Sequence, residues 1–118
     1  MKKIFIIEDD ADILDLTSYL LTEAGHTVVS SLTLRSVDYI KEVNPDLILL
    51  DHRLKDGLGD KLCLEVKKDE ATAHIPVIFV SADINIHEIA EKSCADAYLN
   101  KPFDIYDLIA IIEEFLKK

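Results

Sequence analysis

Residues 4–10 read IFIIEDD and residues 46–54 read DLILLDHRL, so two apolar runs each end in acidic residues. Apolar runs of four or five residues rich in Ile, Leu and Phe are typical of strands buried on both faces, as in parallel sheets covered by helices. In such sheets the functional crevice lies at the carboxyl ends of the strands. We therefore expect Glu8, Asp9 and Asp51 to converge on one site.

Three carboxylates placed together repel one another, and this repulsion costs stability unless a cation or a proton relieves it. A hard divalent cation is the simplest relief, because such ions prefer oxygen ligands. The two runs thus predict a cation site as well as a sheet.

The overall negative charge argues against nucleic acid and anionic membranes as binding partners. The 118 residues include 23 acidic and 13 basic side chains, which gives a formal net charge of −10. Because nucleic-acid affinity rests largely on cationic side chains, we expect no direct binding to nucleic acid, and none to an anionic membrane. No apolar stretch approaches the roughly 20 residues that cross a bilayer, and MKKIFII runs into acids rather than a cleavage site. We expect a soluble, cytoplasmic protein with one domain over residues 1–118.

The cysteines and histidines do not predict a metal site. Cys63 and Cys94 lack the spacing of a zinc site or a disulfide framework, so both are expected to be buried free thiols. His52 follows Asp51, but neighbours at a strand end point in opposite directions. The other histidines are scattered along the chain, at positions 26, 74 and 87.

Strands and helices alternate along the predicted chain. Strands are expected over residues 4–7, 27–31, 47–50, 77–80 and 97–99, and each is followed by a turn and a helical pattern. Shorter helices are expected over residues 36–43, 61–69 and 86–92. Strict alternation with short links predicts an α/β fold, with a parallel sheet and helices on both faces.

The first and last helices have the clearest patterns. In the first, Asp10 or Asp12 is expected to cap the start and Gly25 to follow the end. Its expected apolar stripe is Ile13, Leu16, Thr17, Leu20, Leu21 and Ala24. In the last, Asp104 is the expected cap. The stripe there is Ile105, Leu108, Ile109, Ile112 and Leu116.

Further polar motifs follow the later strands in a fixed order. They are Ser81-Ala82 after the fourth strand, and Tyr98 shortly before Lys101-Pro102 after the fifth. Together with Glu8-Asp9 and Asp51, this set resembles a response-regulator receiver domain of two-component signalling, akin to the chemotaxis-Y type. The resemblance covers essentially the whole chain. It implies a doubly wound, five-stranded parallel sheet with the flavodoxin-like strand order 2-1-3-4-5.

The resemblance also implies a chemistry for the acids. Asp51 would be the phosphoacceptor, a nucleophile that takes a phosphoryl group from a phosphohistidine. The cofactor would be Mg²⁺, for which Mn²⁺ can substitute. Its ligands would be Asp9, Asp51, Glu8 acting mainly through water, and the backbone carbonyl of Arg53.

The remaining motif residues would contact the phosphoryl group or report its presence. Lys101, the Ser81 hydroxyl and the backbone amide of Ala82 would bind phosphoryl oxygens. Ser81 and Tyr98 would form the switch, with Tyr98 turning inward. The Lys101-Pro102 bond is typically cis in this family. No enzymatic activity is implied beyond self-phosphorylation and autodephosphorylation.

The partners implied are a sensor histidine kinase or phosphotransfer protein, and a downstream protein that binds the face of the last helix. A phosphorylation-dependent dimer is a further expectation. Ile111 and Phe115 favour that face, since they flank the buried stripe, although packing against a neighbouring element explains them equally well.

The chain departs from the family pattern in three places. Lys55 replaces a usual proline, Leu58 replaces an acid found near Gly59, and Cys94 replaces a glycine before Ala-Asp. These changes bear on the loops rather than on the chemistry.

Three other functions compete with this assignment. A flavodoxin-like module needs a phosphate-cradling loop where the first acids stand, and an aspartyl phosphatase usually has an acid at the position of Arg53. A receiver-like interaction module that is never phosphorylated stays open as the alternative.

Overall fold

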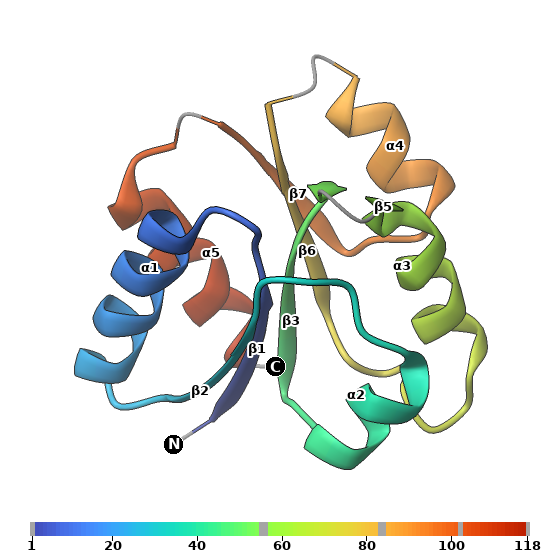
Figure 1. Cartoon of the computed structure of the whole chain (residues 1–118), viewed down its shortest axis with the longest axis horizontal. Coiled ribbons are helices and arrows are strands. Elements are labelled where there is room, and N and C mark those ends of the chain that lie inside the picture. Colours follow the sequence, from blue (N-terminus) through green and yellow to red (C-terminus); the bar gives the residue numbers. More distant parts are fainter. Residues whose placement is uncertain (1, 55–56, 83–84, 102, 118) are drawn as a thin grey trace.

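The computed structural model describes residues 2–54, 57–82, 85–101 and 103–117. Figure 1 shows a twisted sheet between two layers of helices. The sheet is parallel, with strands in the order β2-β1-β3-β6-β7. The bounds are β1 Lys3–Ile7, β2 Thr27–Ser31, β3 Leu47–Asp51, β6 Val77–Ser81 and β7 Ala97–Asn100. This is the predicted order 2-1-3-4-5, and each predicted strand is confirmed to within a residue at either end.

The helices are divided between the two faces of the sheet. Their bounds are α1 Ala11–Glu23, α2 Val37–Val43, α3 Gly59–Lys68, α4 Ile86–Lys92 and α5 Ile105–Leu116. Helices α1 and α5 cover one face, and α2, α3 and α4 cover the other (Figure 1). Within the described residues, none of the helices combines the length and the apolar character that a membrane crossing requires.

Alternating strand residues build two apolar cores, as the period of two in a strand requires. Ile4 and Ile6 of β1 join the core under α1 and α5, whereas Phe5 and Ile7 join the core under α2, α3 and α4. Four residues of β1 and all five of β3 and β6 are buried. The apolar runs of these strands are therefore buried on both faces, as predicted.

The loop after β3 contains a small antiparallel pair that was not predicted. It joins β4 Arg53–Leu54 to β5 Gly57–Leu58. Helix α3 then begins at Gly59, earlier than expected, and the Gly59 amide donates a hydrogen bond to the carbonyl of His52 at 2.7 Å. A Cβ at Gly59 would lie 3.0 Å from the carbonyl oxygen of Asp51, so a larger residue would require the end of β3 to shift by a few tenths of an ångström.

The ends of α1 follow the prediction, and its buried face follows it in part, since Thr17 and Leu21 of the predicted stripe are buried. Asp10 caps the helix by accepting hydrogen bonds from the amides of Asp12 and Ile13 at 3.0 and 3.2 Å. Gly25 follows the end with φ +96°. The buried residues are Leu14, Thr17 and Leu21. Leu16 is 55% exposed and Ala24 is exposed, so their place in the buried stripe was wrong.

The geometry of a helix explains the error at Leu16. Leu14 lies on the row with Thr17 and Leu21 that faces the sheet, and Leu16 lies roughly 200° around the helix from Leu14.

In α5 the predicted stripe is confirmed. Asp104 caps the start of the helix. Leu108, Ile112 and Leu116 are buried, and Ile105 and Ile109 are half-buried.

The two cysteines differ from each other. Cys63 is buried in α3 as expected, and burial raises the pKa of its thiol to about 12. Cys94 is exposed, so the prediction that it is buried was wrong. It stands in the surface turn between α4 and β7 with φ +62°, a conformation that favours glycine.

Candidate functional site

The carboxyl ends of β1 and β3 bring the three predicted acids together. Glu8 and Asp9 follow β1 directly, Asp51 is the last residue of β3, and Ile7 pairs with Leu50 in the parallel register. Carboxylate oxygens of the three acids lie within 4.8 Å of one another. Glu8 and Asp51 are each only 5% exposed, and Asp9 is half-buried. The expected convergence is confirmed.

Lys101 supplies a positive charge to this cluster from the far side of β6. Its amide donates to the carbonyl of Ser81 at 2.8 Å, which fixes the chain after β7 against the end of β6. Its Nζ donates to Oε1 of Glu8 at 3.0 Å and to Oδ2 of Asp51 at 3.3 Å. Pro102 and its peptide bond lie outside the described residues.

The pKa values show that one ammonium group does not neutralise the cluster. Burial, followed by the hydrogen bond and charge of Glu8, raises the pKa of Asp51 to about 7, although Lys101 opposes this shift. Burial alone would lower the pKa of Lys101. The hydrogen bond to Glu8 and the charges of Asp51 and Glu8 outweigh burial and raise that pKa. Further positive charge would therefore favour the ionised form of Asp51.

The donor set fits a hard divalent cation. Such an ion takes carboxylate oxygens, and Mg²⁺ binds through one or two of them while it keeps several waters. Glu8, Asp9 and Asp51 provide such oxygens at one place. Arg53 begins β4, two residues after Asp51, and its carbonyl stays a predicted ligand.

Ser81 and Ala82 lie at the end of the neighbouring strand. Ser81 is the last residue of β6 and is buried, and it follows Val80, the register partner of Asp51. Ala82 is the next residue and is exposed. Both predicted phosphate-binding residues therefore lie at the carboxyl end of the strand next to β3, and their roles stay predictions.

Tyr98 lies in β7 beside the site rather than in it. It is half-buried, and its register partner is Phe79, two residues before Ser81 on β6. Its ring packs edge-to-face on the ring of His87 in α4, with centroids 5.4 Å apart and planes at 88°.

Sequence reasoning missed two features near the acids. The Asp10 amide donates to Oε2 of Glu8 at 3.3 Å, so the residue that caps α1 also holds a site carboxylate. A cavity of about 460 Å³ opens beside Lys101, lined mainly by apolar side chains. Its lining residues are Ile13, Leu16, Thr17, Ala82, Lys101, Phe103 and Ile105. The exposed Leu16 is the sequence signal for it, but periodicity had assigned Leu16 to the core.

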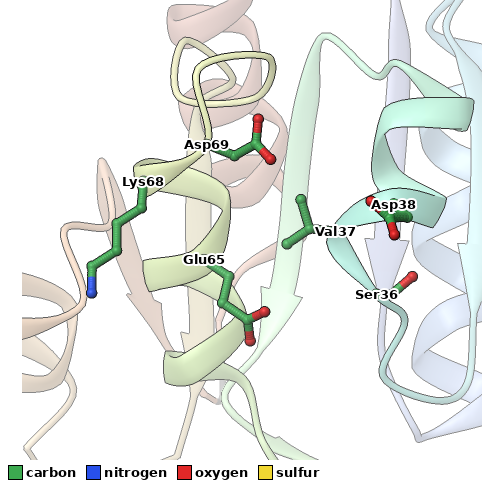
Figure 2. Close-up of a pocket in the computed structure, with 6 residues that line it drawn as sticks. All are labelled: Ser36, Val37, Asp38, Glu65, Lys68 and Asp69. Carbon is green, nitrogen blue, oxygen red and sulfur yellow. The ribbon is translucent and has the colours of Figure 1, made fainter.

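A second groove, also of about 460 Å³, lies between α2 and α3. Figure 2 shows Val37 and Asp38 of α2 facing Glu65 and Asp69 across it. Lys41 bridges its two sides through Asp69 at 2.7 Å and Asp38 at 3.9 Å. The groove shares no residue with the acid cluster.

Comparison with known proteins places the chain in a family. Residues 4–113 match the model of the response regulator receiver domain, so the chain belongs to that family. Receiver domains accept a phosphoryl group in two-component signalling, interact with histidine kinases or phosphotransfer proteins, and bind Mg²⁺ at an acidic site. The chain is thus a signalling module of this class.

Individual relatives agree with this assignment. The DNA-binding dual master transcriptional regulator RpaA of Synechocystis is 37% identical over all of this chain and 50% of its own length. The polar-differentiation response regulator DivK of Brucella ovis is 31% identical over 98% of this chain and 96% of its own. The chain therefore spans about half of the first relative and nearly all of the second.

A solved structure shows the same fold. The BeF3-activated receiver domain of DrrB, a Thermotoga maritima OmpR/PhoB homologue, has a TM-score of 0.84 and 27% identity. The alignment covers 100% of this chain and 99% of that chain.

Proposed function

We propose that Asp51 accepts a phosphoryl group from a histidine kinase or phosphotransfer protein, and that this switches the conformation of a single receiver domain over residues 1–118. The observation that carries the proposal is the surroundings of Asp51. Its buried carboxylate stands within 4.8 Å of the Glu8 and Asp9 oxygens and 3.3 Å from the Lys101 ammonium.

The transfer follows from the chemistry of a carboxylate nucleophile. An ionised Asp51 oxygen attacks the phosphorus of a phosphohistidine, the new phosphorus–oxygen bond forms, and the phosphorus–nitrogen bond breaks with its electron pair returned to the imidazole. Charge spreads over the equatorial oxygens, so the site must supply cations and hydrogen-bond donors aimed at them. Because the pKa of Asp51 is about 7, positive charge nearby increases its nucleophilic form.

A bound Mg²⁺, or Mn²⁺ in its place, would be held by Asp9, Asp51, Glu8 through water, and the Arg53 carbonyl. It would supply positive charge to the phosphoryl oxygens. Lys101 would exchange its hydrogen bond to Asp51 for one to a phosphoryl oxygen.

The other phosphoryl contacts and the switch come from β6 and β7. Ser81 and the Ala82 amide would donate to remaining oxygens. The shift of Ser81 would let Tyr98 turn inward. Self-phosphorylation from a small donor and autodephosphorylation complete the proposed activity.

The apolar cavity beside Lys101 supports a protein donor. Leu16 and Phe103 line it beside Lys101, whose ammonium group bonds to Asp51, and a donor helix would bury them while it presents its phosphohistidine. On the other side, the downstream partner would bind the face of α4, β7 and α5. Ile111 and Phe115 of α5 are half-buried and pack against the apolar core under α1 and α5, so this second surface stays a prediction.

Intact-mass measurement tests the proposal. With acetyl phosphate and Mg²⁺, the wild-type chain should gain one phosphoryl group, and both EDTA and Asp51→Asn should abolish the gain. Asp46→Asn, before the start of the same strand, is the matched control and should be labelled normally. Hydroxylamine should strip the label, as expected of an acyl phosphate. Full labelling of Asp51→Asn, or a label that resists hydroxylamine, would favour the unphosphorylated interaction module.

A further inference from the structure

Among the described residues, the ring of His87 contacts the ring of Tyr98 on the face of the sheet that α4 covers. Helix α4 packs against β7 (Figure 1), and His87 lies in its first turn. The two rings meet edge-to-face at 5.4 Å, an arrangement that is attractive because the ring edge is positive and the ring face negative. The Tyr98 ring therefore lies against the first turn of α4.

The remaining surroundings leave this side of Tyr98 loosely packed. A cavity of about 270 Å³ adjoins both rings, and Ala90 and Ala95 line it with small side chains. Asn85 precedes α4 without a side-chain capping hydrogen bond within the described residues. Among the described residues, His87 therefore makes a ring-to-ring contact with Tyr98 next to an open cavity.

We propose that His87 is a positioning residue that holds Tyr98 outward in the unphosphorylated domain and so sets how readily the domain switches. This inference rests on the proposed function, because it regulates the same site. If Tyr98 turns inward toward Phe79 and Ser81, its ring leaves His87. The contact is then present in one state alone. An interaction that differs between two states shifts their equilibrium by its own free energy.

The test uses beryllofluoride, which mimics the phosphoryl group, with Mg²⁺ and the full chain. Its apparent affinity is followed by the amide NMR signals of Asp51 and Tyr98. His87→Ala should bind beryllofluoride about 2- to 10-fold more tightly than wild type, the range expected from one aromatic pair. His87→Phe keeps a ring edge for Tyr98 and should restore an affinity close to wild type. His74→Ala, at another exposed histidine, is the matched control and should change nothing.

A double-mutant cycle separates this role from a general effect on α4. In a Tyr98→Leu background, His87→Ala should no longer change the affinity, because the contact is already gone. An unchanged or weakened affinity in His87→Ala, or the same gain in the Tyr98→Leu background, would overturn the proposal. Absence of beryllofluoride binding in the wild-type chain would instead contradict the proposed function.

Discussion

Asp51 is held at the end of β3 in surroundings that oppose its own charge. The side chain is 5% exposed, and burial together with Glu8 raises its pKa to about 7. A carboxylate kept near the midpoint of its titration responds strongly to a cation or a phosphoryl group placed beside it. The same property makes this residue a source of instability in the absence of either.

The pH dependence of stability has a definite sign. An ordinary aspartate in the unfolded chain titrates near pH 3.8, whereas folded Asp51 titrates near 7, so the folded state binds more protons between these values. The Asp51 contribution to the free energy of unfolding should therefore fall as pH rises through this window and stay low above it. In EDTA, Asp51→Asn should raise the melting temperature clearly at about pH 8 and little at about pH 4. Equal or larger stabilisation at the lower pH would contradict the raised pKa.

The residues that sequence reasoning found differ in how they reach the site. Glu8 and Asp51 could be predicted from two apolar runs alone, because parallel strands end at the same edge of a sheet. Lys101 contacts Asp51 from across β6. It was predicted as a site residue only through the family resemblance, because no local pattern joins residues 50 positions apart. The pairing of His87 with Tyr98 could not be predicted, because it depends on how α4 lies against β7.

At the scale of single elements, the strands were easier to predict than the faces of the helices. β3 is apolar over four consecutive residues, and this predicts burial on both sides with no need to choose a face. α1 has leucines at both 14 and 16, so its periodicity allows two stripes. Packing against the sheet selects Leu14, and this leaves Leu16 beside the apolar cavity near Lys101.

Alanine substitutions at these two leucines test the assignment of the buried face. Leu14 is 6% exposed, and Leu14→Ala should lower the free energy of unfolding by about 2–5 kcal/mol through lost burial and a residual cavity. Leu16→Ala should change it by about 0.5 kcal/mol or less, because this side chain is already largely in water. Urea unfolding followed by circular dichroism measures both. Comparable losses at the two positions would place Leu16 back in the core.

At the scale of the whole molecule, one sheet connects the two apolar cores and carries the site residues at its edge. Residues from β1, β3 and β6 belong to both apolar cores, and the acids and Lys101 stand at the carboxyl edge of the same sheet. The core under each layer of helices includes residues of these strands. We therefore expect the domain to unfold cooperatively as one unit.

Cooperative unfolding of the whole domain predicts how the unfolding transition responds to a bound ligand. A group that binds only the folded state stabilises it by about 2.7 kcal/mol when its free concentration is 100 times its dissociation constant. Beryllofluoride with Mg²⁺ should therefore raise the midpoint of a single transition, and far-ultraviolet circular dichroism and tyrosine fluorescence should report the same midpoint before and after addition. Asp51→Asn should abolish the shift, whereas Asp46→Asn should retain it. Two separate transitions, of which only one moves with ligand, would show that the two helical layers unfold independently despite their shared strands.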